Sequence, residues 1–168
     1  MFKKCLSMVL AACLLSACGY HLGGMKPAQM KNMETFCVDV FDNKTQVPGV
    51  AMQMTTALAD AVQRDGTYRM VKRSEADFTI NGVVKNIDRS AWSTDYVDAY
   101  HGLEIGVTVH VEYNVIDNRT GQVVFHSYAS GQSSYFNDQG NVQTALESAL
   151  SYATRRAAED VVNGIANR

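Results

Sequence analysis

The sequence predicts an α+β fold, a two-layer α/β sandwich with two helices packed on one face of a four- to five-stranded mixed sheet. The strongest observation is strict alternation over residues 103–117, where apolar side chains occupy every second position. Two segments with helical spacing of apolar residues, 50–64 and 142–166, flank the strand-forming middle of the chain. The order strand, helix, strand, long strands, helix places both helices against one sheet.

The first part of the domain has the pattern strand, helix, strand. Residues 35–41 (TFCVDVF) predict a first strand, and residues 42–44 predict the turn that ends it. The helix over 50–64 is expected to end at Gly66, because a glycine after Asp65 can adopt the left-handed C-terminal cap. Residues 67–71 predict a short second strand.

Three longer strands and a helix follow. Residues 76–89 alternate around Gly82, which predicts a bulge or a close backbone approach. A tight turn at 117–121 leads from the strand over 103–117 into a return strand over 122–135. The buried face of the first of these hairpin strands is predicted to consist of Ile105, Val107, Val109, Val111, Tyr113 and Val115.

The last element is predicted to be a long amphipathic helix, 142–166, with Asn141 as its N-cap. Alanine dominates its apolar stripe, and short side chains let a helix pack closely on a sheet. The stripe consists of Val142, Leu146, Ala149, Ala153, Ala157, Val161 and Ile165.

The N-terminus has the pattern of a bacterial lipoprotein signal. Lys3 and Lys4 precede a short apolar run that ends in Leu-Ser-Ala-Cys at residues 15–18. The run is shorter than the roughly 20 apolar residues that a permanent spanning helix requires. We therefore expect cleavage before Cys18, whose thiol would carry diacylglycerol and whose new amino group would carry an N-acyl chain of the palmitate type. The expected organisation is a signal peptide at 1–17, a lipidated tether at 18–34 and a single domain at 35–168.

Cleavage would leave 151 residues, which suits one domain with a full core. The loss of Lys3 and Lys4 would bring the net charge to −4, from 13 basic and 17 acidic side chains. Such a balance argues against nucleic-acid binding. With Cys18 acylated, Cys37 would have no disulfide partner, so we expect a small core residue there.

No pattern of residues points to catalysis. The serines lack a nucleophile-elbow context, and Asp95 and Asp98 share a polar loop in which carboxylates are usually solvated. His110 and His126 lie on neighbouring hairpin strands, where they could converge on a metal ion, but no third ligand has an obvious spacing. We therefore predict that the protein is not an enzyme and has no metal site and no cofactor apart from its lipid.

Aromatic residues gather between the long strands. Trp92, Tyr96 and Tyr100 lie in the loop 90–102, and Tyr135 and Phe136 lie near a second loop. Aromatic residues at such places either cap the core or form a contact patch. The sequence leaves both alternatives open.

The residues Cys-Gly-Tyr-His-Leu at 18–22 resemble the start of the mature proteins of the LPS-assembly lipoprotein family LptE, whose members often begin with Cys-Gly-aromatic-His-Leu. The resemblance continues through the first strand, Leu58 near the centre of the first helix, and Asp-Gly-Thr-Tyr at 65–68. It also includes Ala-Asp at 76–77, the long hairpin and the terminal helix. It thus covers nearly the whole mature chain.

This resemblance implies a function. LptE-like lipoproteins sit inside the lumen of the large outer-membrane β-barrel LptD, help it to assemble, plug its pore and assist the passage of lipopolysaccharide to the outer leaflet. The implied partners are LptD and lipopolysaccharide, and the implied location is the periplasmic side of the outer membrane, held by the lipid. The residues that we expect to contact the barrel or lipopolysaccharide are Trp92, Tyr96, Tyr100, His101, Arg89 and Lys85.

The chain departs from some family members in one respect. Those members carry basic residues in loops that touch lipopolysaccharide phosphates, whereas the loop 90–102 here contains Asp95 and Asp98 and no Lys or Arg. Strong phosphate pairing by the loop tip is therefore not expected, and the substitutes nearby in sequence are Lys72, Arg73, Lys85 and Arg89.

A second interpretation is a periplasm-facing lipoprotein of another kind. The segment with Asp-Gly at 65–66 and Ala-Asp-Phe at 76–78 also resembles domains of curli-secretion pores and of lipoproteins that activate peptidoglycan synthases. An activator of that kind usually needs a long disordered arm, and fewer than twenty residues separate Cys18 from the first strand here. A pore needs membrane-spanning strands, whereas the polar face of the 103–135 hairpin includes Glu104 and Glu112.

Overall fold

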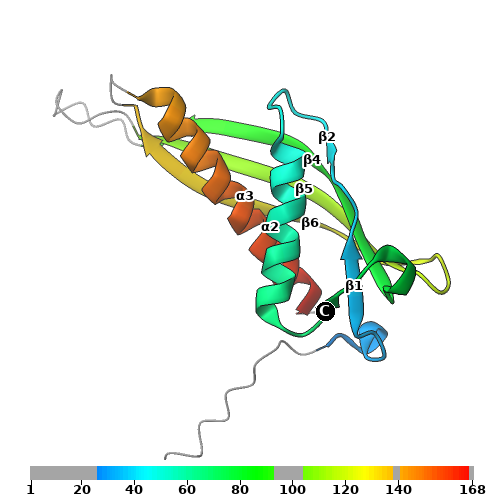
Figure 1. The fold of residues 1–168 in the computed structure, drawn as a ribbon. Coiled ribbons are helices and arrows are strands. Elements are labelled where there is room, and N and C mark those ends of the chain that lie inside the picture. The colour runs from blue at the N-terminus through cyan, green and yellow to red at the C-terminus, as the bar shows by residue number, and fades with distance from the viewer. Residues whose placement is uncertain (1–25, 93–103, 138–140, 167–168) are drawn as a thin grey trace, which may run out of the picture.

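The computed structural model describes residues 26–92, 104–137 and 141–166, which form one mixed sheet with two helices on one of its faces (Figure 1). This confirms the predicted α+β class. The elements are η1 (Ala28–Met30), β1 (Thr35–Val38), β2 (Asp42–Asn43), α2 (Val50–Asp65), β3 (Arg69–Met70), η2 (Arg73–Glu75), β4 (Phe78–Ala91), β5 (Glu104–Asp117), β6 (Val123–Phe136) and α3 (Val142–Ala166).

The sheet has the strand order β3-β1-β4-β5-β6, and β2 pairs with β4 beyond the end of β1. β1 runs parallel to β3 and β4, whereas β4, β5 and β6 form an antiparallel meander of three strands of 14 residues each. The described residues thus form six strands rather than four or five. The short strand expected over 67–71 corresponds to β3, and the additional strand is β2, which has two residues.

The predicted single strand over 35–41 and the predicted turn over 42–44 are wrong in detail. β1 ends at Val38, and Asp42–Asn43 form β2, which lies parallel to β4. The chain leaves the sheet between them because Phe41 turns into the core, where its ring lies against Gly82. A Cβ atom on Gly82 would lie 2.5 Å from the Phe41 ring and 2.5 Å from the Glu112 carbonyl oxygen, so the predicted close backbone approach at this glycine is confirmed. The irregularity of β4 lies between Val84 and Asn86 instead.

Helix α2 is bounded by two glycines in the left-handed conformation, Gly49 (φ 78°) and Gly66 (φ 75°). The Gly66 N–H donates to the carbonyl of Val62, which confirms the predicted C-cap. The helix buries one face against the sheet, as the periodicity predicts. The buried residues are Val50, Met54, Leu58, Ala61 and Val62.

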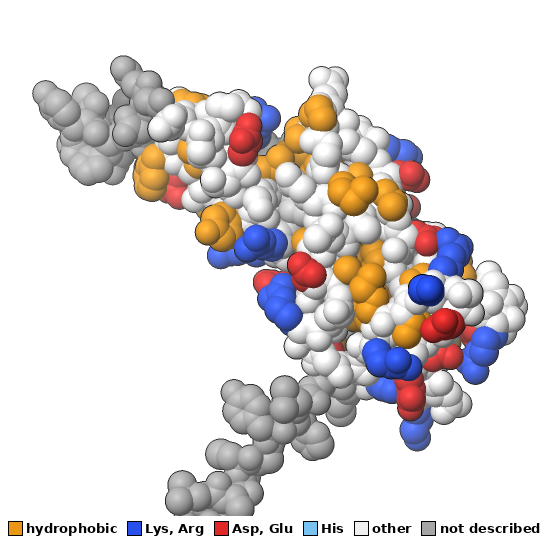
Figure 2. Space-filling view, in the orientation of Figure 1, with side chains coloured by type: hydrophobic (Ala, Val, Ile, Leu, Met, Phe, Trp, Pro, Cys, Tyr) orange, Lys and Arg blue, Asp and Glu red, His pale blue; other side chains and the backbone are white. Residues whose placement is uncertain are grey.

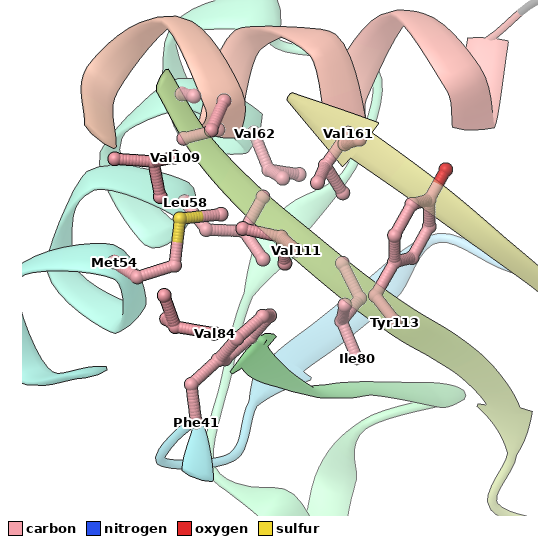
Figure 3. Close-up of a cluster of buried hydrophobic side chains, with 14 of the residues drawn as sticks. Phe41, Met54, Leu58, Val62, Ile80, Val84, Val109, Val111, Tyr113 and Val161 are labelled. Carbon is pink, nitrogen blue, oxygen red and sulfur yellow. The ribbon is translucent and has the colours of Figure 1, made fainter. Parts of the chain in front are cut away.

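The alternation of β5 is confirmed from Val107 to Val115. Every second side chain in this stretch is at most 1 % exposed, and they pack with α2 and α3 as Figure 3 shows. On α3, the predicted stripe is buried from Ala149 to Ile165, whereas Val142 is exposed and Leu146 is partly exposed. The buried part lies so close to β6 that a Cβ atom on Gly131 would be 2.0 Å from the Ala153 carbonyl oxygen. Small residues on both elements bring the helix onto the sheet.

The packed domain extends before β1. Met30 and Met33 are buried in the core, and Lys26 donates to the Met33 carbonyl over 2.9 Å. The Lys26 ammonium also lies 5.5 Å from the centre of the Tyr68 ring. The C-terminal part of the tether expected at 18–34 therefore belongs to the folded domain.

Candidate functional site: the outer sheet face and the sheet tip

The face of the sheet opposite the helices, here called the outer face, is polar because of the alternation of β5. The side chains of Thr108, His110, Glu112 and Asn114 point away from the core and are partly exposed. Neighbouring strands continue this row, since Asn114 donates to Asn81 Oδ1 over 3.1 Å on β4. Asn114 Oδ1 is also 2.8 Å from His126 Nδ1 on β6. A ladder of polar side chains therefore crosses three strands.

Charges on the outer face are paired with one another. Lys85 Nζ lies 2.8 Å from Glu112 Oε2, and His126 Nε2 lies 3.7 Å from the other oxygen of the same carboxylate. The hydrogen bond from Lys85 holds the pKa of Glu112 below its usual range, and the same bond raises the pKa of Lys85. Because these groups are exposed, the pair adds little to stability and mainly fixes how the two side chains lie.

The two strand histidines do not converge. His110 lies opposite Ser130 in the register and His126 lies opposite Asn114, so they occupy separate rows of the sheet. His110 Nε2 is instead 3.0 Å from Asp88 Oδ2. Across residues 26–92, 104–137 and 141–166, no three His, Cys, Asp or Glu side chains come together in a way that could hold a metal ion.

The end of the outer face where β4 ends and β5 begins, here called the sheet tip, is aromatic. The Trp92 backbone N–H donates to the Glu104 carbonyl over 2.9 Å, and Phe136 lies opposite Glu104 on β6. The indole covers Gly106, at which a Cβ atom would lie 2.0 Å from Trp92 Nε1. Trp92 and Phe136 are 49 % and 62 % exposed, so the two aromatic segments of the sequence meet at one accessible surface.

The aromatic residues near the loops differ in exposure. Tyr135 is 9 % exposed and belongs to the core, whereas Trp92 and Phe136 are exposed. The expected contacts Tyr96, Tyr100 and His101, and the expected lipidation site Cys18, lie outside the described residues. Lys85 is engaged by Glu112, and Arg89 is exposed on β4.

Sequence reasoning missed the role of Gly106. Glycine is neither clearly polar nor clearly apolar, so the alternation of β5 gives no information about this position. The available signal is that glycine lacks a side chain where the other residues on this face of β5 carry one. A glycine inside a strand often marks a close approach by another group. Here that group is the Trp92 ring, which is held against the strand rather than free.

Other polar groups of the described residues have structural roles. Asp77 accepts backbone N–H groups from Glu34 and Thr35, at 2.9 and 3.0 Å, and these bonds lower its pKa. Burial raises the pKa of the Tyr68 hydroxyl to about 12, so this group is a neutral phenol rather than a base at neutral pH. Cys37 is buried as expected, with its sulfur 3.1 Å from Thr79 Oγ1.

The helix-bearing surface has mixed character. Figure 2 shows hydrophobic side chains in separate patches among charges of both signs. A shallow groove of about 440 Å³ runs between α2 and α3, and the Arg64 guanidinium on its wall is 3.7 Å from the Glu159 carboxylate. Neither α2 nor α3 combines the length and the apolarity needed to cross a lipid bilayer.

Comparison with known proteins decides the family. The model of the lipopolysaccharide-assembly family LptE matches residues 33–167. The chain belongs to this family. LptE is a family of non-enzymatic lipoproteins and is not a cofactor-binding family. No curated protein sequence matches the chain.

Several solved structures share the fold at low sequence identity. The rare lipoprotein B from Shewanella oneidensis is 12 % identical with a TM-score of 0.52, and the match covers 80 % of this chain and 95 % of that one. The hypothetical protein CT253 from Chlamydia trachomatis is 6 % identical with a TM-score of 0.56, over 79 % and 95 % of the two chains. Protein XCC0632 from Xanthomonas campestris is 10 % identical with a TM-score of 0.52, over 86 % of each chain. These similarities show the arrangement of sheet and helices.

Proposed function

We propose that this LptE-family protein plugs the outer-membrane β-barrel LptD, assists its assembly and helps to insert lipopolysaccharide into the outer leaflet. The observation that carries the proposal is the outer face, a polar surface whose charges pair with one another. The lumen of a large barrel is lined by polar side chains and water, so a domain that enters it needs polar rather than apolar surfaces. The family match over residues 33–167 supports the same assignment.

The protein is proposed to reach the barrel as a lipoprotein on the periplasmic side of the outer membrane. Diacylglycerol and an N-acyl chain on Cys18 would anchor it, since each buried methylene contributes about 0.8 kcal/mol and two or more chains hold stably. The distance from Cys18 to the packed residue Met30 is short in sequence. An anchor so close to the domain raises its effective concentration at the periplasmic rim of the barrel.

The proposed contact residues are Trp92, Tyr96, Tyr100, His101, Arg89 and Lys85. The sheet tip supports this for Trp92, because a large aromatic ring held against a glycine is a rigid surface for a partner. Arg89 is exposed and forms no ion pair within residues 26–92, 104–137 and 141–166, and a guanidinium is a good partner for a phosphate or a carboxylate. Lys85 would have to leave Glu112 to do the same.

Purification from membranes in mild detergent tests the proposal. We expect the wild-type protein to retain LptD in a stoichiometric complex, and its depletion to make the outer membrane more permeable. A peptidoglycan synthase in place of the barrel, or a ring of this chain alone, would support the alternative lipoprotein functions and contradict ours.

Substitution of Trp92 by glutamate is expected to weaken the association with LptD at least tenfold. Loss of a central aromatic anchor commonly costs about 2 kcal/mol or more of binding free energy, which corresponds to roughly 30-fold. Quantitative retention of LptD by the tagged variants measures the effect. Tyr152→Glu is the matched control, because Tyr152 is a 61 % exposed aromatic residue on α3, away from the sheet tip. Equal retention by Trp92→Glu and wild type would show that the tip is not a contact.

A further inference from the structure

The two long edges of the sheet are protected to different degrees. On β6, the Ser130 N–H donates to Asp160 Oδ2 over 3.0 Å, and Arg156 Nη1 donates to the Gln132 carbonyl over 3.1 Å. Both partners come from α3, which also lies against Gly131. Side chains of a helix thus occupy the outward backbone groups at the centre of this edge, so another strand could not pair with residues 130–132.

The opposite edge, on β4, is paired only in its first half. β1 and β2 pair with β4 as far as Val84, where the Lys44 N–H donates to the Val84 carbonyl over 3.0 Å. Beyond this point β4 continues to Ala91 with β5 on its other side. Figure 1 shows this half of β4 at the margin of the sheet, past the end of β2.

The register shows which backbone groups are exposed there. The Trp92 N–H donates to the Glu104 carbonyl, so even-numbered residues at this end of β4 bond to β5. Odd-numbered residues 87, 89 and 91 therefore direct their N–H and C=O groups away from the sheet. The Ile87 N–H is capped by its neighbour Asn86 Oδ1 at 2.9 Å. Within the described residues, Arg89 and Ala91 have no such cap.

The surroundings of this edge favour one kind of occupant. A surface groove of about 540 Å³ separates residues 86–89 from residues 44–47, which leaves room for an extended backbone. Asp88 also lines the groove, but its carboxylate lies 3.0 Å from His110 Nε2. Lys44 and Arg89 lie on the two sides of the groove, and neither forms an ion pair among the described residues. A second copy pairing edge to edge would bring these cations together, whereas an acidic segment would neutralise them.

We propose that the open edge of β4, residues 87–91, binds an extended acidic segment of the barrel by strand addition, in line with β2. This rests on the proposed function, because the segment is assigned to LptD. Main-chain hydrogen bonds to Arg89 and Ala91 would supply affinity, and the cations beside the groove would select acidic side chains. The contact would fix the angle at which the sheet tip faces the barrel wall.

Amide hydrogen exchange of the wild-type protein, alone and in its detergent-solubilised complex with LptD, tests the proposal directly. We expect exchange at Arg89 and Ala91 to slow at least tenfold in the complex, with no comparable change at 124–128 on the β6 edge. An intact complex with unchanged exchange at 87–91 would overturn the strand addition and leave the proposed function standing. Absence of LptD from the wild-type preparation would overturn both. Protection that rises with concentration in the protein alone would identify a second copy as the occupant and overturn the assignment to LptD.

Proline variants give an independent result. Arg89→Pro removes an outward N–H without touching the ladder to β5, and Tyr128→Pro makes the same change on the β6 edge, where even-numbered residues point outward. We expect at least a tenfold loss of retained LptD for Arg89→Pro and little change for Tyr128→Pro. Arg89→Gln keeps the N–H and removes the charge, so it should lose less than the proline variant. Equal retention by Arg89→Pro and Arg89→Gln would overturn a backbone contact.

Discussion

Substitution of Gly131 by valine is expected to lower the free energy of unfolding by about 3 kcal/mol, the upper part of the usual range for overpacking. A Cβ atom at this position would lie 2.0 Å from the Ala153 carbonyl oxygen and 2.2 Å from the Ala157 nitrogen. Both are backbone atoms in the middle of α3, so the whole helix must move off the sheet. Urea unfolding followed by circular dichroism measures the change.

The choice of valine makes this prediction specific. Valine favours strands more than glycine does, so local preference alone predicts a gain in stability. Ser130→Ala is the matched control, because the Ser130 side chain is exposed and its backbone bond to Asp160 is retained. We expect that variant to stay within about 0.5 kcal/mol of the wild type. A stable Gly131→Val protein with an unchanged unfolding midpoint would contradict the close packing of α3 on β6.

The features that the sequence predicts well are those that depend on local periodicity. The alternation of β5 identifies its buried face because a strand places successive side chains on opposite sides. The spacing over 50–64 and the glycine at 66 predict α2 and its end, since both depend on neighbours within one or two helical turns. The alanines of α3 also predict that this helix lies close to the sheet. They do not predict that Gly131 is the residue against which it lies.

The features that the sequence does not predict depend on contacts between distant residues. Phe41 leaves the strand because Gly82, about forty positions later, provides space for its ring. Tyr135 and Phe136 are adjacent aromatics, and the register with β5 alone decides that the first is buried and the second exposed. No short window of sequence contains this information.

The candidate site shows the same division. The polar outer face follows from alternation, and the aromatic residues near the loops are visible in the sequence. Their meeting at the sheet tip requires the pairing of Trp92 with Glu104 and of Glu104 with Phe136. The open edge of β4 is less predictable still, because it results from how early β2 ends and from which edge α3 covers.

Substitution of Cys18 by alanine is expected to move most of the protein from the membrane fraction to the soluble fraction. The thiol is the proposed attachment point for diacylglycerol, and alanine cannot form the thioether. Attachment to the membrane through two or more acyl chains is then lost. No helix of the described residues could replace it by spanning the bilayer. Fractionation of cells, with mass spectrometry of the N-terminal peptide, measures both the location and the modification.

Cys13→Ala is the matched control, since it removes a thiol of the same apolar run that is expected to leave with the signal peptide. Its fractionation should equal that of the wild type.

Loss of the anchor and loss of the barrel contact also have separable effects. If the plug is held chiefly by its folded surfaces, Cys18→Ala protein produced in excess should still bind LptD, because raised concentration compensates for the missing tether. A wild-type protein with an unmodified N-terminus, free in the soluble extract, would contradict the lipoprotein assignment on which that argument depends.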